Sequence, residues 1–400
     1  MKTSSRGAQD GRPRNVLYLH TTSEIGGSDV SLLQLIERLD RRRFRPMIAL
    51  PADGPLVPRL AAAGCEVLIV DRMRKLTTRR GLGFLLAFAF NYPLAVWRLA
   101  RLAAARHVDL IHTNTIHNLY GIGLAAVTRR PHVWHVREIV WQSGVVRRVE
   151  RWLARLSDRV VVTSDAVGEM FVTASGQLGA NVCKVPNGVD LQAFAPGPAN
   201  AAIRAALDLP ADGPVVGVVC RLDAWKGVDV FLRAAAIVAE ARPDARFAVF
   251  GGAIEGQQAY ARELEALASS LGLRDAVRFA GWRFGPPDMP SVYRALSLLV
   301  LPSRRPEPFG LVLLEAMATG LPVVATDQGG PREICGEGET GRHVPPDDPA
   351  RLAEAIRWML DHPDRARAMG ESGRRRVESR YDIRATVRAI EAIYDDLLPA

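Results

Sequence analysis

One stretch, residues 296–326, restricts the fold of this 400-residue chain more than any other. An apolar run over 296–301 has the length and composition of a buried strand, and it ends at Pro302. A polar loop follows, and then an apolar helical pattern that stops at Gly320 and Pro322, residue types that commonly end helices. A second buried strand begins at once. This order predicts a parallel sheet that binds its ligand where the first strand ends.

The loop between that strand and that helix carries groups suited to a phosphate-bearing sugar. The backbone N–H groups of Phe309, Gly310 and Leu311 fall at the predicted helix start, where an end charge of roughly +0.5 suits a diphosphate. Glu307 precedes the helix and Glu315 lies about two turns inside it, so one carboxylate could bind a sugar ring and the other a ribose. Two glutamates at this spacing also occur by chance. In that alternative Glu307 only favours the helix start, and Glu315 is a solvated helix residue.

Strand and helix patterns alternate along both halves of the chain. Besides the opening stretch, strands are expected at 16–20, 47–50, 67–70, 108–112, 160–163, 215–220, 247–251 and 277–279. The alternation predicts an α/β protein with two doubly wound, Rossmann-like domains facing a cleft, in which the ligand binds. Residues 191–213 are rich in Ala, Pro and Gly, which is typical of a linker.

Charge is distributed unevenly within the net +9. Residues 1–190 hold 27 Lys and Arg against 15 Asp and Glu, a net of +12, whereas residues 191–400 hold 25 against 28, a net of −3. The chain shows no nucleic-acid-binding motif, and its aromatic residues are not interleaved with the basic clusters. An anionic membrane surface is therefore a better hypothesis for the basic half than nucleic acid.

Cysteine usage and the first residues indicate a cytoplasmic protein. The four cysteines are scattered and form no CxxC, so neither a disulfide framework nor a zinc site is expected. Residues 1–14 are polar and basic, without the apolar segment of a signal peptide, and are expected to be a disordered lead.

Two segments of the N-terminal half bear on the membrane hypothesis. Basic residues between 72 and 80 precede the apolar segment 82–98, whose run before Asn91 is only about ten residues, against the roughly 20 that span a bilayer. This segment is either a core helix kinked at Pro93 or a helix that dips an apolar face into a membrane interface. A second stripe, flanked by arginines, is expected to face the core. It consists of Val146, Val149, Trp152, Leu153 and Leu156.

The motif PSRRPEPFGLVLLEAMATGLPVVATDQGG, with Glu307-x7-Glu315, resembles the donor site of retaining, nucleotide-sugar-dependent glycosyltransferases of the GT-B type, family 4. The segments CRLDAWKG and FGG extend the resemblance over nearly the whole chain. It implies that Arg221 and Lys226 hold the donor diphosphate, as two cations beside a helix start would. It further implies that Glu307 binds the donor sugar and Glu315 the ribose. The remaining donor-site residues implied are Gly26, Gly27, Gly251, Trp282, Arg283, Phe309, Gly310 and Leu311.

The N-terminal half departs from the family pattern at one position that matters for catalysis. Many relatives carry a histidine followed by an acid directly after the strand that corresponds to the one in PHVWHVRE. In this chain Arg137 and Glu138 occupy those two positions. His135 lies two residues earlier, and positions two apart on a strand face the same side. Either His135 substitutes for the missing histidine, or Arg137 steadies phosphate charge on the leaving group or the acceptor.

We predict a retaining, metal-independent hexosyltransferase without a cofactor, which moves sugar from a UDP- or GDP-sugar to a sugar or lipid-linked acceptor. Polysaccharide or glycolipid synthesis, at the inner face of the cytoplasmic membrane, is the expected setting. The expected divisions are an acceptor-binding domain over 15–190, a donor-binding domain over 191–379 and a tail helix over 380–400 that returns to the first domain. The alternatives are a sugar-nucleotide epimerase, a phosphorylase and a non-catalytic sugar-binding scaffold. A phosphorylase would be longer, and a scaffold would not be expected to keep the four donor-site charges.

Overall fold

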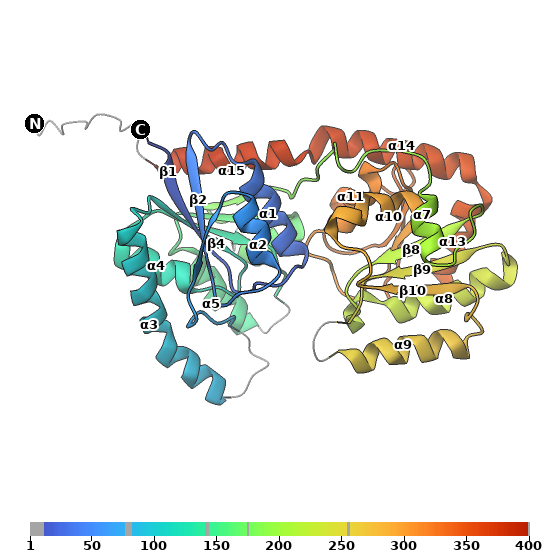
Figure 1. Cartoon of the computed structure of the whole chain (residues 1–400), viewed down its shortest axis with the longest axis horizontal. Helices are drawn as coiled ribbons and strands as arrows, with labels where there is room; N and C mark the ends of the chain where they lie inside the picture. The colour runs from blue at the N-terminus through green and yellow to red at the C-terminus, as the bar shows by residue number, and fades with distance from the viewer. Residues whose placement is uncertain (1–11, 77–81, 141–143, 174–175, 254–256, 399–400) are drawn as a thin grey trace, which may run out of the picture. The chain divides into compact units, whose positions relative to one another are not determined.

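The computed structural model describes residues 12–76, 82–140, 144–173, 176–253 and 257–398 (Figure 1). The chain divides into two compact units. Unit 1 comprises Met1–Pro186 together with Arg384–Ala400, and unit 2 comprises Asn187–Ile383. The last helix of the chain therefore packs with the N-terminal unit. Most of the expected disordered lead, and the basic residues Arg79 and Arg80, lie outside the described residues.

Unit 1 is built on a parallel sheet. Among its described residues the strand order is β3-β2-β1-β4-β5-β6-β7. The strands are β1 (Arg14–Leu19), β2 (Phe44–Leu50), β3 (Glu66–Ile69), β4 (Leu110–Asn114), β5 (His132–Val136), β6 (Arg159–Val162) and β7 (Val182–Lys184). The order reverses between β1 and β4, which is where ligands bind in doubly wound sheets.

Helices cover the sheet of unit 1 and bury its apolar side chains. They are α1 (Gly27–Arg38), α2 (Leu56–Ala62), α3 (Leu82–Ala105), α4 (Tyr120–Thr128), α5 (Gly144–Ala154), α6 (Asp165–Gly168), the 3-10 turn η1 (Glu169–Phe171) and α15 (Ile383–Leu397). One apolar core contains Leu17 and Leu99, and another contains Trp134 and Val160. Helix α15 is tied to the sheet by Tyr394, whose hydroxyl lies 2.9 Å from that of Tyr18.

Unit 2 repeats this plan. Its described strands are ordered β10-β9-β8-β11-β12-β13, with the reversal between β8 and β11. They are β8 (Val215–Val219), β9 (Arg246–Phe250), β10 (Val277–Gly281), β11 (Leu298–Leu301), β12 (Val323–Thr326) and β13 (Arg342–Val344). The helices are α7 (Ala201–Ala206), η2 (Ala224–Lys226), α8 (Val228–Ala241), α9 (Gln258–Ser270), η3 (Pro286–Asp288), α10 (Met289–Ala295), α11 (Leu311–Ala318), α12 (Pro331–Ile334), α13 (Pro349–Asp361) and α14 (Pro363–Arg380).

The linker prediction for residues 191–213 is wrong. Phe194, Ile203 and Leu207 are buried in the core of unit 2. The Arg204 guanidinium donates hydrogen bonds to the carbonyl oxygens of Pro210, Ala211 and Gly213, which folds the segment back on itself. A few apolar residues within an Ala- and Pro-rich segment are enough to pack it onto a neighbouring core.

Helix α5 corrects a second prediction, because most of its apolar stripe does not face the core. Val149, Trp152 and Leu156 are 50%, 58% and 48% exposed. Leu153 packs against the core, and the Val146 side chain lies outside the described part of the helix. An amphipathic pattern shows that a helix has two faces, but it does not show which face the rest of the chain covers.

Helix α3 combines features of both interpretations offered for it. Ala95, Leu99 and Ala103 are buried against the sheet, as a core helix requires, while Phe90 and Trp97 are exposed. The helix continues through Asn91 and Pro93 to Ala105, so the interruption at Asn91 does not limit its length. A stretch of 23 residues in this helix is long and apolar enough to cross a membrane. Core helices of soluble proteins meet the same criterion of length and composition.

Candidate active site

Two loops meet at the point where the strand order of unit 2 reverses. One follows β8 and contains Lys226, and the other follows β11 and contains Glu307. The Arg304 N–H donates to the Trp225 carbonyl oxygen over 2.8 Å. Gly227 has a φ of +69°, and a Cβ there would lie 2.0 Å from the Pro302 carbonyl oxygen. The close approach of the loops therefore requires glycine at this position.

Lys226 and Glu307 form a largely buried ion pair between these loops. Lys226 Nζ donates to Glu307 Oε1 over 2.6 Å, and Ser303 Oγ donates to the same oxygen over 2.5 Å. The two charged side chains are only 16% and 6% exposed. The ammonium group also lies 4.0 Å from the centre of the Trp225 ring, within the range of a cation–π interaction. The structure thus holds a cation and a carboxylate in a fixed mutual geometry.

A third loop, after β12, fixes the backbone around Glu307. The Gly330 N–H donates to the Glu307 carbonyl oxygen over 2.9 Å. A Cβ at Gly329 would lie 2.3 Å from that same oxygen, and a Cβ at Gly330 would lie 2.4 Å from the Phe309 carbonyl oxygen. The glycine pair therefore lets this loop pack directly against the loop that carries Glu307.

Helix α11 starts at Leu311, as predicted. Gly310 precedes it with a φ of +101°, and no side chain caps the first turn. The predicted amides of Phe309, Gly310 and Leu311 thus lie at a helix start next to Glu307.

Glu315 is buried, so the alternative that it is a solvated helix residue is wrong. It lies in α11 and is 8% exposed. The hydroxyl of Tyr293, on α10, donates to Glu315 Oε2 over 2.5 Å. Burial raises the pKa of Glu315 to about 7, and the Tyr293 hydrogen bond opposes that rise. Nothing in the sequence pattern singled out Tyr293, because the contact joins two different helices.

The other residues predicted for the donor site follow β8, β9 and β10. Arg221 is exposed after β8. Gly251 has a φ of +103°, and a Cβ there would lie 2.0 Å from the Cys220 carbonyl oxygen. Trp282 is 56% exposed, and its indole N–H donates to the Ala253 carbonyl oxygen over 3.0 Å. Arg283 directs its guanidinium to the Ala206 carbonyl oxygen at the end of α7.

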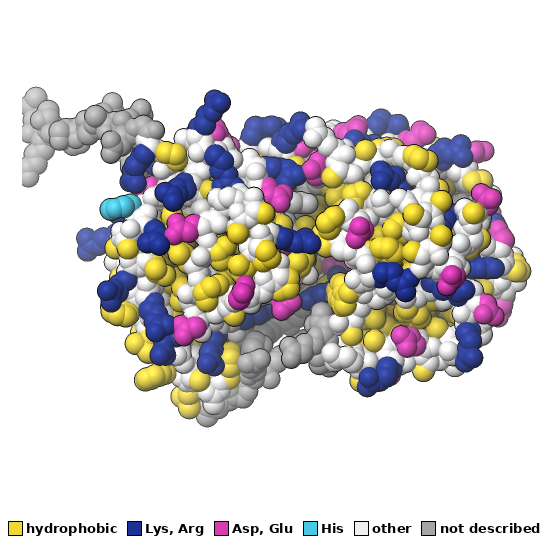
Figure 2. Space-filling view, viewed as in Figure 1, with side chains coloured by type: hydrophobic (Ala, Val, Ile, Leu, Met, Phe, Trp, Pro, Cys, Tyr) yellow, Lys and Arg dark blue, Asp and Glu magenta, His cyan; other side chains and the backbone are white. Residues whose placement is uncertain are grey.

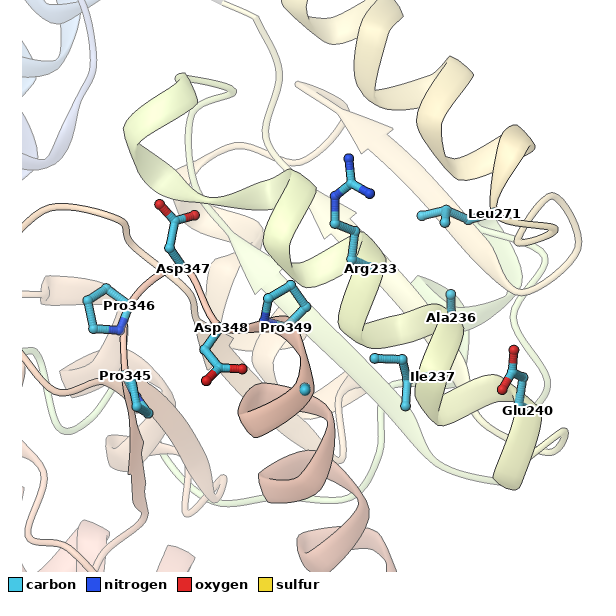
Figure 3. Close-up of a pocket in the computed structure, with 11 residues that line it drawn as sticks. Arg233, Ala236, Ile237, Glu240, Leu271, Pro345, Pro346, Asp347, Asp348 and Pro349 are labelled. Atoms are coloured by element: carbon cyan, nitrogen blue, oxygen red, sulfur yellow. The ribbon is translucent and has the colours of Figure 1, made fainter.

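A separate hollow in unit 2 has a volume of about 690 Å³ (Figure 3). It lies between α8 and the segment that leads into α13, and Arg233, Ile237 and Asp347 are among its lining residues. None of the residues that line it belongs to the Lys226 or Glu307 loop. Arg304 connects the two regions, because it pairs with Asp347 over 2.6 Å.

In unit 1, polar side chains converge where β1, β4 and β5 end. Asn114 Nδ2 lies 3.2 Å from His20 Nδ1, and His20 Nε2 contacts the Asp29 carboxylate. Asn114 Oδ1 accepts a hydrogen bond of 2.6 Å from Arg137 Nε. A terminal nitrogen of Arg137 lies 3.4 Å from His135 Nδ1. All five residues are buried.

This network includes residues that the sequence interpretation missed. His20, Asp29 and Asn114 carried no motif, although His20 directly follows β1 and Asp29 lies in the first turn of α1, after the predicted glycine pair. Gly26 N–H donates to Asp29 Oδ2 over 2.7 Å, so the glycine pair positions the acid that contacts His20. Glu138, in contrast, accepts the backbone N–H of Ile116 over 2.9 Å and thereby holds the loop after β4.

Burial decides the charges in this network. It lowers the pKa of His135 well below the ordinary value, and the nearby Arg137 charge lowers it further. Burial also lowers the pKa of Arg137 to about 10, which leaves it protonated at neutral pH. Unit 1 therefore presents a neutral histidine beside a buried cation.

Two Rossmann-like units, each with polar loops where its strand order reverses, match the fold of the GT-B glycosyltransferases. Residues 200–376 match the family model described as Glycosyl transferases group 1, and residues 25–193 match that described as Glycosyltransferase Family 4. The chain belongs to this family and is a nucleotide-sugar-dependent glycosyltransferase.

Its relatives support this assignment over nearly the full length. The chain is 33% identical to the D-inositol 3-phosphate glycosyltransferase of Kineococcus radiotolerans, over 93% of this chain and 91% of that protein. It is 35% identical to the protein of the same name from Corynebacterium urealyticum, over 94% and 92%. The crystal structure of Anabaena HepE in complex with UDP-glucose is 28% identical, with a TM-score of 0.81 over 96% of this chain and 100% of that one. The predicted fold and family are confirmed.

Proposed function

We propose that the protein transfers a sugar from a UDP-sugar bound by unit 2 to an acceptor bound by unit 1, with retention of anomeric configuration. The buried Lys226–Glu307 pair at the β8–β11 reversal carries this proposal. Solved complexes of HepE with UDP and with UDP-glucose support a uridine nucleotide as the donor.

In this scheme Lys226, with Arg221, binds the donor diphosphate, and the start of α11 adds N–H groups beside it. These donors stabilise the charge that develops on the leaving phosphate. Glu307 binds sugar hydroxyls and Glu315 binds the ribose. Glu307 is a poor nucleophile, because Lys226 and Ser303 both donate to its Oε1. The acceptor oxygen therefore attacks the anomeric carbon from the side that the diphosphate leaves, and the acceptor proton passes to the departing phosphate oxygen.

For the acceptor, we propose a hydroxyl compound that carries a phosphate, recognised by Arg137. Two observations support it: Arg137 is a buried cation beside His135, and the relatives above are named for transfer to an inositol phosphate. Such a phosphate occurs in a soluble polyol phosphate and in a lipid headgroup, and the second would serve synthesis of a cell-surface glycolipid or polysaccharide.

A donor and acceptor screen tests these proposals. Thermal shift with UDP- and GDP-sugars should show stabilisation by a UDP-sugar. The same donor should then be consumed with inositol phosphate or phosphatidylinositol, and NMR of the product should show the donor's anomeric configuration. An inverted product would refute retention, and equal use of unphosphorylated inositol would refute the role of the acceptor phosphate.

A further inference from the structure

Helix α5 and the two residues after it carry two adjacent stripes of different chemistry. Val149, Trp152 and Leu156 are spaced three and four residues apart, so they share one face of a helix that turns about 100° per residue. Arg148, Arg151 and Arg155 repeat that spacing one position earlier and are also exposed. The basic stripe therefore runs along the edge of the apolar one.

The opposite side of α5 accounts for its attachment to unit 1. Ala154 is 3% exposed, and Leu153 packs on the core that contains Trp134 and Val160. The stripe of Val149, Trp152 and Leu156 takes no part in that contact. A row of large apolar side chains left exposed beside charged ones is typical of an interaction surface rather than of isolated surface residues.

Helix α3 presents a second exposed row. Leu86, Phe90, Leu94 and Trp97 follow helical spacing and are 63%, 72%, 38% and 55% exposed. The Arg101 guanidinium lies 4.9 Å from the centre of the Trp97 ring, which continues the row with a cation. In Figure 2 hydrophobic and basic side chains are exposed together at the lower left, over α3.

Both helices are connected to the edge of the sheet that holds the His135–Arg137 network. The segment before α3 contacts the loop after β4, where the Leu76 N–H donates to the His117 carbonyl oxygen over 3.1 Å. The segment before α5 contacts the same loop through Glu138 and Ile116. The chain segments that precede α3 and α5 thus both contact the loop after β4.

We propose that these rows, together the α3/α5 surface, dock unit 1 on an anionic lipid bilayer. The α3/α5 surface comprises Leu86, Phe90, Leu94, Trp97, Arg101, Arg148, Val149, Arg151, Trp152, Arg155 and Leu156. Arginines pair with lipid phosphates while Trp and aliphatic side chains enter the headgroup region, which is how interfacial helices bind. The net charge of +12 in residues 1–190 also attracts this half of the chain to an anionic bilayer. Because α3 buries Ala95, Leu99 and Ala103 in the core, docking in the plane of the interface fits the fold and insertion does not.

Cosedimentation with vesicles tests this proposal independently of the reaction, since it needs neither donor nor acceptor. The full chain should bind phosphatidylglycerol-containing vesicles, bind pure phosphatidylcholine vesicles weakly, and dissociate as salt shortens the electrostatic range. Replacing Arg148, Arg151 and Arg155 by Gln should weaken binding about 100-fold, because each basic residue near an anionic surface contributes several-fold. Trp152→Ser should weaken it about fivefold to tenfold.

Two control variants make the same kinds of substitution in unit 2 instead of in α5. Replacing the exposed Arg351, Arg365 and Arg367 by Gln lowers the net charge equally, and Ile237→Ser removes a 40% exposed apolar residue; both should bind like wild type. Equal losses in the α5 and unit 2 arginine variants would overturn the proposal, as would absence of binding to anionic vesicles. So would a concentration-dependent dimer in gel filtration that Trp152→Ser abolishes, because the surface would then be a protein interface. Failure of any of these leaves the proposed transferase function standing.

Discussion

The two units place polar groups at the same position of the same kind of sheet, yet they do so differently. In unit 2, Lys226 and Glu307 are opposite charges paired at 2.6 Å. In unit 1, a neutral His135 lies beside the cationic Arg137, and the carboxylate of Asp29 is engaged by His20. A nucleotide sugar presents a charged diphosphate and neutral sugar hydroxyls side by side. A cation next to a carboxylate suits such a ligand, because the cation can bind the diphosphate and the carboxylate can accept hydrogen bonds from the hydroxyls. A buried cation beside a neutral ring suits an anionic acceptor.

The largest effect is expected at the unit 1 network. Arg137→Ala should lower kcat/KM for the phosphate-bearing acceptor by about 10²- to 10³-fold, because the guanidinium can donate two charge-assisted hydrogen bonds to the acceptor phosphate, each worth roughly 1.5–3 kcal/mol. The UDP affinity, a property of unit 2, should stay unchanged. Steady-state kinetics and calorimetry on the same preparation check both. Arg137→Lys, which keeps the charge but not the planar donor, should recover part of the loss. Unchanged kcat/KM for the phosphate-bearing acceptor in both Arg137→Ala and His135→Ala would place the acceptor site elsewhere.

The next effect lies in the paired charges of unit 2. Lys226→Ala should weaken UDP binding by about 10- to 100-fold, since a charge-assisted hydrogen bond contributes roughly 1.5–3 kcal/mol. Glu307→Ala should instead preserve UDP binding and impair use of the complete UDP-sugar. Calorimetry with UDP and then UDP-sugar separates the two cases. Lys184→Ala, at the exposed Lys184–Asp165 pair of unit 1, is the control. Equal UDP affinity in wild type and Lys226→Ala would remove this pair from the donor site.

A smaller effect should follow from the glycines that bring the loops together. Gly227→Ala should destabilise the protein by about 1–3 kcal/mol, because the positive φ is unfavourable and the new Cβ meets the Pro302 carbonyl oxygen. Gly272→Ala is a matched control, having a φ of +72° but no atom within 4 Å of its added Cβ. Chemical denaturation should therefore separate the cost of conformation from the cost of contact. Equal losses would show that the loop contact is adaptable.

The smallest effect concerns pH. The raised pKa of Glu315, about 7, means that its carboxylate, the form that accepts ribose hydrogen bonds, forms as pH rises through 7. UDP affinity should therefore increase between pH 6 and 8, a window set by that pKa. Tyr293→Phe removes a hydrogen bond that favours the carboxylate, so the midpoint should move roughly one pH unit higher.

The same pKa has a consequence for folding. The unfolded-state pKa of a glutamate is near 4.5, so the folded protein holds the extra proton between the two values and loses stability as pH rises from about 4.5 to 7. A UDP-binding midpoint that does not move in Tyr293→Phe would show that the tyrosine only packs.

The site contacts that could be predicted from the sequence differ between the two units. The sequence placed Lys226 and Glu307 on two loops that each end a strand of one parallel sheet, where carboxyl ends share an edge, but it did not predict their ion pair. The roles of Arg221, Trp282 and Arg283 stay predictions. The contacts of Tyr293 with Glu315, and of His20 with Asp29 and Asn114, could not be predicted, because each joins elements whose spacing depends on packing.

The sequence by itself determined the alternation of strands and helices, the family and the residue types at the donor loops, because periodicity and glycine or proline positions act over a few neighbouring residues. The tertiary structure alone decided that residues 191–213 pack on unit 2 and that Trp152 and its neighbours face outward. Burial depends on which distant surface covers a side chain, and a local pattern contains no information on that surface.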